Sequence, residues 1–210
     1  MAAGQCGTCS NGSACRIKGR RFATVTITAS TWQFDNFKLQ AEDQTMKITI
    51  IQISKTKHRF FQEAEQEYLK RLQAFAKIEV ITIKESVAPQ GSASESGRLS
   101  AKNKEGQEIL KQIQTKRLPE NSFIIALTEK GQSLNSVKFA EFLKQKIDFG
   151  PGHITFIIGG PFGLSDEVLK AAHYQLSFSA FTFTHEMIRV LLMEQLYRAC
   201  TIMKGKTYHY

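Results

Sequence analysis

Residues suited to binding a small ligand gather in the last third of the chain, beginning with the sequence GGPFG at residues 159–163. Glycines let a backbone turn sharply and let a ligand approach it closely. Ser165 follows, and a serine there can cap a helix that has acidic residues in its first turn. The spacing is neither GxGxxG nor GxxxxGK[ST], so neither a dinucleotide fold nor a P-loop is indicated. An ordinary strand-to-helix loop is the alternative interpretation.

A second candidate segment, residues 176–183, alternates small polar residues with large apolar ones. We expect a strand there whose backbone groups hold the edge of an adenine ring while the phenyl groups of Phe178, Phe181 and Phe183 enclose it. A half-buried strand with an aromatic face toward the core would have the same pattern, so these residues alone leave that alternative open.

Two side chains near the start of the next helix are candidates for a role in catalysis. His185 begins the helix, and Arg189 lies one turn later on the same face, where it could meet a phosphate or a developing anion. A histidine at this position is often only a cap. The tail at residues 204–210 mixes charge with aromatic rings, a combination that suits RNA, although a solvated terminus is the alternative.

The elements that must position these residues alternate along the chain from Met46 onward. Apolar runs predict strands at residues 47–53, 78–83, 123–127, 154–158 and 176–183. Apolar residues recur at helical spacing between these strands. The alternation predicts an α/β domain with a mainly parallel sheet flanked by helices, and such sheets bind ligands beyond the carboxyl ends of their strands. Residues 84–103 are rich in Ser, Gly, Lys and Glu and predict an exposed loop.

The first 45 residues differ in composition from the rest of the chain. Residues 1–34 contain no Asp or Glu and are rich in Ser, Thr, Gly and Ala, which is compatible with an organelle transit peptide. An extension translated from too early a start is the second interpretation. We favour the second, because Met46 directly precedes a strand pattern. We expect residues 1–45 to lie outside the fold and residues 46–210 to form the domain.

The overall composition bears on the kind of partner that the protein binds and on the cellular compartment in which it works. The net charge of +9 suits a polyanionic partner, although solubility alone can account for it. No apolar run is long enough to predict a membrane span. Cys6 and Cys9 form a CxxC pair that lacks a second pair or a nearby histidine, so we expect no metal. Cys200 is expected to be a buried hydrophobe, and a reducing, cytoplasmic location is the default. A plastid or mitochondrion is the alternative if the N-terminus is a transit peptide.

The order and spacing of the motifs from Met46 to Tyr210 resemble those of the RlmH family of 23S rRNA pseudouridine N3-methyltransferases, a branch of the SPOUT superfamily. The resemblance is strongest over residues 154–209, where IGGPxGLS, LSxSAxTxxH, LxxEQLYRA and a terminal YH follow one another. It implies a SPOUT methyltransferase fold with a C-terminal trefoil knot, which is a rare exception among folds. It also implies a homodimer that binds S-adenosylmethionine and methylates N3 of a pseudouridine of large-subunit rRNA in the assembled ribosome.

The resemblance also implies roles for individual residues. The implied contacts to S-adenosylmethionine come from Leu127, Gly159, Phe178, Ser179, Ala180, Phe181, Thr182 and Phe183. For catalysis we expect Arg189 to stabilise the imide anion, with His185, His209 or solvent accepting the proton from N3. His209 could act across the dimer. The chain departs from the family in its phenylalanines, where leucines are usual, and in Tyr210, where the family ends in Arg or Lys.

Two other functions remain compatible with the sequence. One is an RNA-binding protein that kept the fold and lost catalysis, since a fold never guarantees a function. The other is a SPOUT methyltransferase that acts on another RNA such as tRNA. The intact glycine turn and cofactor segment favour the enzyme over the first alternative. The lack of a separate RNA-binding domain argues against the second.

Overall fold

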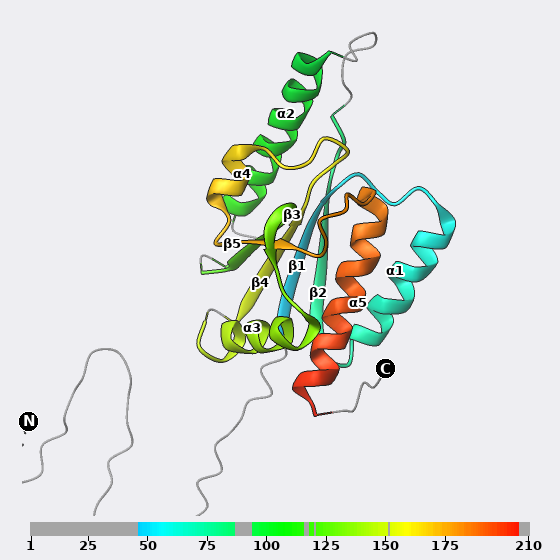
Figure 1. Ribbon diagram of the computed structural model, residues 1–210, viewed down its shortest axis with the longest axis vertical. Coiled ribbons are helices and arrows are strands. Elements are labelled where there is room, and N and C mark those ends of the chain that lie inside the picture. The colour runs from blue at the N-terminus through cyan, green and yellow to red at the C-terminus, as the bar shows by residue number, and fades with distance from the viewer. Residues whose placement is uncertain (1–45, 87–93, 116–117, 120, 151, 206–210) are drawn as a thin grey trace, which may run out of the picture. The chain divides into compact units, whose positions relative to one another are not determined.

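The computed structural model describes residues 46–86, 94–115, 118–119, 121–150 and 152–205. Strands and helices alternate along these residues (Figure 1). In chain order they are β1 (Met46–Ile53), α1 (Arg59–Leu72), β2 (Ala76–Ile83), α2 (Glu95–Gln114), β3 (Phe123–Ser133), α3 (Ser136–Asp148), β4 (His153–Ile158), α4 (Asp166–Ala171), β5 (Tyr174–Ser177) and α5 (His185–Met203). The N-terminal extension, three of the cysteines and His209 lie outside the described residues.

The five described strands form one parallel sheet in the order β2-β1-β4-β3-β5. The expected parallel sheet flanked by helices is therefore confirmed. The strands β1 and β4 lie at its centre, with Ile48 opposite Ile154 and Ile50 opposite Phe156. Because all strands run the same way, the loops that follow them meet at one edge of the sheet. The trefoil knot implied by the resemblance stays a prediction.

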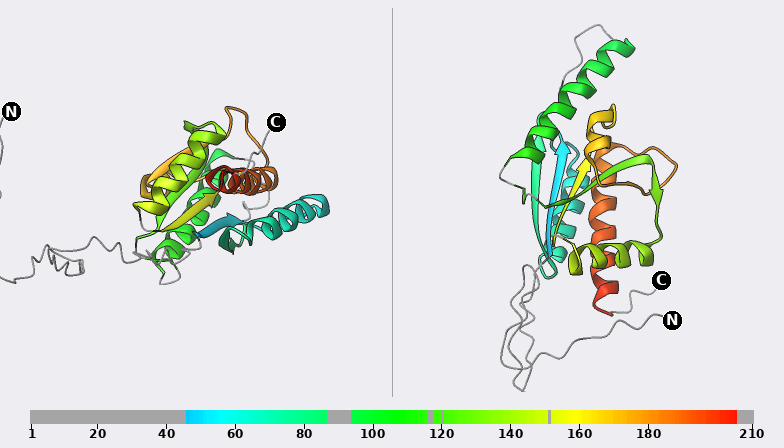
Figure 2. Two further views of the ribbon diagram at one scale, coloured as in Figure 1. Left: turned by 90° about the horizontal axis from the view of Figure 1, so that it is seen from below. Right: turned by 90° about the vertical axis from the view of Figure 1, so that its left-hand side faces the viewer.

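Each face of the sheet packs against its own helices, and Figures 1 and 2 show α1 and α5 on the face opposite α2 and α4. Alternate residues of β1 point to opposite faces, as a strand requires. Ile48 and Ile50 join the core formed with α1, α3 and α5, whereas Ile51 and Ile53 join the core formed with α2 and α4. Burial on both faces explains why the central strands read as continuous apolar runs.

The prediction of a loop at residues 84–103 is wrong for the second half of that range. The helix α2 begins at Glu95, and the Ser94 hydroxyl caps it by accepting a hydrogen bond from the Gly97 amide at 3.3 Å. The buried face of α2 carries small residues such as Ala101 and Gly106 rather than a large apolar stripe. A Cβ on Gly106 would lie 2.1 Å from the Ser165 hydroxyl oxygen, so α2 packs directly against the start of α4. A segment rich in small residues has the composition of a loop, so its composition did not predict this helix.

The prediction of a strand at residues 176–183 is also wrong for most of that range. Strand β5 ends at Ser177, because its pairing with β3 ends there. Local hydrogen bonds then take over: the Ser177 hydroxyl donates to the Ser179 carbonyl at 2.9 Å, and the Phe181 amide donates to the Ser179 hydroxyl at 3.0 Å. Serine side chains commonly divert a backbone from strand to turn in this way. Residues 178–184 therefore form a loop, and this loop leads into α5.

Candidate active site

A cavity of about 1020 Å³ lies where the loops after β4 and β5 meet the start of α5. Its walls come from the middle of β3, the glycine turn, the β5–α5 loop, the end of the β1–α1 connection and the first turns of α1, α2 and α5. The expected cofactor residues that line it are Leu127, Gly159, Phe178, Ser179, Phe181, Thr182 and Phe183. Ala180 belongs to the same loop but is not among the lining residues. The structure therefore gathers residues that lie far apart in the sequence around one space at the expected edge of the sheet.

The glycine turn is closed by its own backbone. The Gly163 amide donates to the Gly160 carbonyl at 3.0 Å, and Gly163 has a φ of 75°, a conformation that favours glycine. A Cβ on Gly159 would lie 2.8 Å from the carbonyl carbon of Gly163. The absence of a side chain at Gly159 is therefore required first by the turn itself. The ligand space depends on that turn only indirectly.

The β5–α5 loop presents aromatic side chains to the cavity rather than to the core. The side chain of Phe181 is 80% exposed, and Phe183 is exposed as well. Phe178 instead packs edge-on against Phe139, with ring centroids 6.2 Å apart. The alternative of a half-buried strand with an aromatic core face therefore does not describe this loop. Exposed rings beside backbone amides are suited to enclosing a flat heterocycle.

Arg189 is fully buried (0% exposed) and binds the end of β1. Its guanidinium donates to Thr56 Oγ1 at 2.9 Å, to the Ser54 carbonyl at 3.0 Å and to the Ile53 carbonyl. Burial lowers the pKa of Arg189, and the acidic residues around it act in the opposite direction. The side chain is not among the cavity residues. These contacts give Arg189 a positioning role, and the expected contact with a developing anion stays a prediction.

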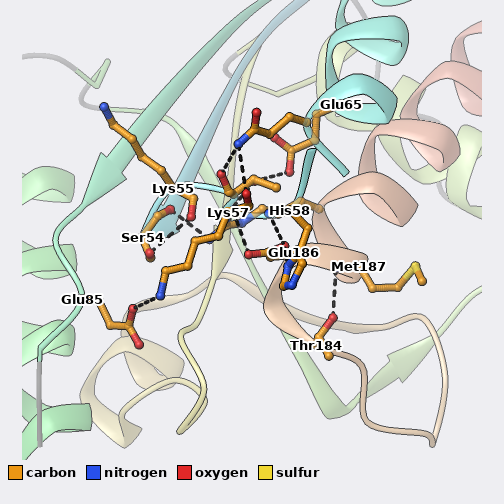
Figure 3. Close-up of polar contacts among 12 residues, drawn as sticks. Ser54, Lys55, Lys57, His58, Glu65, Glu85, Thr184, Glu186 and Met187 are labelled. Carbon is orange, nitrogen blue, oxygen red and sulfur yellow. Dashed lines mark hydrogen bonds and ion pairs between the residues drawn. The ribbon is translucent and has the colours of Figure 1, made fainter. Parts of the chain in front are cut away.

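His185 lines the cavity at the first position of α5. It is not the cap, because the Thr184 hydroxyl accepts the hydrogen bond from the Met187 amide at 3.3 Å (Figure 3). Its Nε2 atom is buried and has no hydrogen-bond partner among the described residues. Burial lowers the pKa of His185, and the nearby Arg189 lowers it further. The imidazole is therefore held in its neutral form near neutral pH.

Glu186 is a site residue that the sequence did not single out. Its carboxylate is 4% exposed and accepts hydrogen bonds from the Lys57 amide at 2.9 Å, the His58 amide at 3.4 Å and His58 Nδ1 at 2.7 Å (Figure 3). Burial opposes the charge, but these hydrogen bonds prevail and lower the pKa of Glu186 to about 2. In the sequence, the only local indication of a role for Glu186 is its position as an acidic residue in the first turn of a helix. The contacts themselves span 128 residues or more of sequence.

The remaining features concern a thiol, an ion pair, metal ligands and membrane spans. Cys200 is buried, as predicted, and burial raises the pKa of its thiol to about 11. Glu194 and Arg198 form an i,i+4 pair on α5, with Arg198 Nε 3.0 Å from the carboxylate. Among the described residues, no group of three or more His, Cys, Asp or Glu side chains could hold a metal ion. None of the helices in the described part of the chain is both long and apolar enough to span a bilayer.

The chain is similar to proteins of known family over most of its length. Residues 46–209 match the family described as "Predicted SPOUT methyltransferase". The ribosomal RNA large subunit methyltransferase H 1 of Clostridium perfringens is 42% identical over 164 residues, which are 78% of this chain and 99% of that relative. The ribosomal RNA large subunit methyltransferase H of Carboxydothermus hydrogenoformans is also 42% identical, with the same 78% and 99% coverage.

A weaker likeness is found to the solved structure of the SpoU methyltransferase AviRb of Streptomyces viridochromogenes in complex with AdoMet. The TM-score is 0.41 at 10% identity, covering 77% of this chain and 60% of that one. A likeness of this degree supports no conclusion by itself. The match over residues 46–209 and the identity across almost the whole length of the relatives are decisive. This chain belongs to the SPOUT methyltransferase family.

Proposed function

We propose that this protein transfers a methyl group from S-adenosylmethionine to N3 of a pseudouridine in large-subunit ribosomal RNA. The observation that carries the proposal is the cavity at the carboxyl edge of the sheet, lined by the loop segments on which the resemblance to the RlmH family rests. Relatives that share 42% of their residues with this chain are named ribosomal RNA large subunit methyltransferase H. The net charge of +9 suits a polyanionic substrate.

The residues around the cavity fit S-adenosylmethionine. A cavity of about 1020 Å³ is large enough for a ligand of this size together with part of a nucleotide. Phe181 and Phe183 offer rings for the adenine, and the backbone from Ser179 to Thr182 offers amides and carbonyls for its edge. Leu127 and the turn at Gly159 would close the opposite wall. When bound, this donor supplies a methyl group made electrophilic by the adjacent positive sulfur.

The remaining catalytic work belongs to the protein. It must hold N3 in line with the methyl group and accept the proton that N3 loses. His185 and His209 are the histidines expected to serve as acceptor, and the lowered pKa of His185 makes it a weak one. Arg189 keeps the β1–α1 connection in place beside the cavity. Its expected electrostatic effect on the imide anion would act through the intervening backbone.

We further propose that the protein works as a homodimer in the cytoplasm, with the activity carried by residues 46–210. A plastid or mitochondrial location is the alternative if residues 1–45 are a transit peptide. Met187, Val190 and Leu191 share one face of α5 by their helical spacing, and none of them is fully buried. Partly exposed apolar residues on one helical face are typical of a partner contact.

Binding of S-adenosylmethionine to two phenylalanine variants tests the cavity assignment. Phe181→Ala removes a cavity ring that is 80% exposed, and Phe149→Ala is the matched control because Phe149 is 88% exposed and lies outside the cavity. Stacking of a base on an aromatic ring contributes about 1–3 kcal/mol, so calorimetry should show affinity falling by about 5- to 150-fold for Phe181→Ala alone. Equal affinity of both variants would refute the assignment. Methyl incorporation into assembled ribosomes, free rRNA and tRNA then identifies the substrate.

A further inference from the structure

The connection between β1 and α1, residues 54–58, is held in one conformation by two side chains of α5. Arg189 binds the Ser54 carbonyl and the Thr56 hydroxyl, and Glu186 binds the amides of the last two residues. Ser54 has a φ of 65°, a left-handed conformation that costs a non-glycine residue about 1–3 kcal/mol. A strained connection fixed by buried charges beside a cavity indicates that its exact placement matters for function.

Glu186 also fixes the proton of the His58 ring. The amides of Lys57 and His58 both donate to its oxygens, and such hydrogen bonds favour the ionised carboxylate. Its third partner, His58 Nδ1 at 2.7 Å, must then carry a proton (Figure 3). The low pKa of Glu186, about 2, is consistent with this assignment. A neutral His58 therefore has its free electron pair on Nε2.

The second ring nitrogen of His58 is available to a substrate. His58 is one of the residues that line the cavity, and its side chain is 66% exposed. Within the described ranges of the chain, Nε2 has no hydrogen-bond partner. The rings of Phe60 and Phe61 lie 5.7 and 6.2 Å from the imidazole, centroid to centroid. Such rings are suited to stacking on an unpaired base.

We propose that His58, oriented by Glu186, is a catalytic residue that accepts the N3 proton of the target base. The inference rests on the proposed function and names the acceptor for that reaction. The N3–H bond breaks and its proton moves to His58 Nε2. The electron pair of N3 forms the new bond to the methyl carbon, and the pair of the broken carbon–sulfur bond remains on sulfur. The ionised Glu186 then stabilises the imidazolium, an arrangement that resembles other carboxylate–histidine pairs.

The electrostatic surroundings favour His58 over His185 as the acceptor. His185 is partly buried beside Arg189, and both effects oppose its protonation. His58 is exposed to solvent and forms a hydrogen bond with the Glu186 carboxylate, so a positive charge on its ring is stabilised. The other charged groups near this pair are largely paired: Lys57 with Glu85 at 3.4 Å, Arg59 with Glu63 at 2.8 Å, Glu65 with the Thr56 hydroxyl at 2.5 Å, and Arg189 of α5 with the same hydroxyl at 2.9 Å.

The test compares His58→Asn with Arg59→Gln. Asparagine keeps a donor near the position of Nδ1 and is a good helix N-cap, so the connection should stay folded, but it cannot accept the proton. Arg59 is the exposed neighbour and lies outside the cavity. With ribosomes and saturating S-adenosylmethionine, His58→Asn should lower the single-turnover rate by about 100-fold or more. The dependence of this rate on pH should also differ from that of the wild type. Affinity for S-adenosylmethionine should not change, and Arg59→Gln should match the wild type.

A readout independent of turnover is the ¹⁵N NMR spectrum of the His58 ring. The wild type should show the Nδ1–H tautomer, and Glu186→Gln should lose that preference. A wild-type Nε2–H tautomer, or a His58→Asn variant with the wild-type rate and pH profile, would overturn the inference while leaving the proposed function intact. A wild type that methylates no RNA would overturn both.

Discussion

Replacing Arg189 with methionine tests whether this buried guanidinium holds the active-site wall together. Methionine fills a similar volume but removes three donors and leaves the Ser54 and Ile53 carbonyls without their charged partner. Each buried acceptor left unpaired costs about 1–3 kcal/mol, and breaking a buried charged network costs about 3–5 kcal/mol in total. We expect the free energy of unfolding to fall by this total. For a domain of this size that corresponds to a lowering of Tm by about 6–20 °C.

The assay is urea denaturation followed by circular dichroism, with Arg59→Met as the control. Arg59 lies on the protein surface in an i,i+4 pair with Glu63, so its loss should leave the midpoint unchanged. Arg189→Lys separates anchoring from charge: lysine keeps the charge but lacks the planar fork that reaches two carbonyls. If the hydrogen bonds of the guanidinium to the β1–α1 connection are what matters, the lysine variant should also be less stable and should transfer the methyl group more slowly. A methionine variant as stable as the wild type but inactive would refute the positioning role and favour direct action on the reaction.

Three further outcomes are expected. Gly159→Ala should weaken S-adenosylmethionine binding by displacing the turn, because the new Cβ would lie 2.8 Å from the Gly163 carbonyl carbon, and calorimetry showing unchanged affinity would contradict this. His153 is buried between the Thr49 and Ser122 hydroxyls, and its pKa is lowered by burial and by Lys47. As the pH falls, His153 is therefore protonated in the unfolded chain at a higher pH than in the folded chain. Its contribution to stability is present above about pH 6.5 and is lost as the pH falls below that value. His153→Gln should flatten that part of the pH–stability curve, whereas an unchanged slope would argue against it. Leu191→Glu should convert the dimer to monomer in light scattering, and a variant that remains dimeric would place the interface elsewhere.

The sequence predicted the parts of the fold that depend on local patterns. The apolar run at residues 154–158 predicts a strand, and the structure has β4 there with every residue buried. Ser165 was expected to cap a helix, and its hydroxyl accepts from the Val168 amide at 3.4 Å. Helix α2 was missed because its buried face uses small residues in place of large apolar ones. The end of β5 was missed because it is set by pairing with β3, not by composition.

The active-site contacts that mattered most could not be read from sequence. Periodicity reports neighbours within a few residues, whereas Arg189 meets Thr56 across 133 residues and Glu186 meets His58 across 128. The helical spacing of His185 and Arg189 predicted that they share a face. It did not predict that one lines the cavity while the other is buried beneath the β1–α1 connection. The packing of α5 against α1 on one face of the sheet brings these residues together.

The most direct measurement of the central claim is the position of the methyl group in ribosomal RNA after reaction. Ribosomes from cells that lack the modification would be incubated with this protein and isotopically labelled S-adenosylmethionine, then digested and analysed by mass spectrometry. We predict that the label appears in one pseudouridine of large-subunit rRNA and that fragmentation places it on N3. Label on another atom, on tRNA instead, or on no RNA while S-adenosylmethionine still binds would contradict the proposed function.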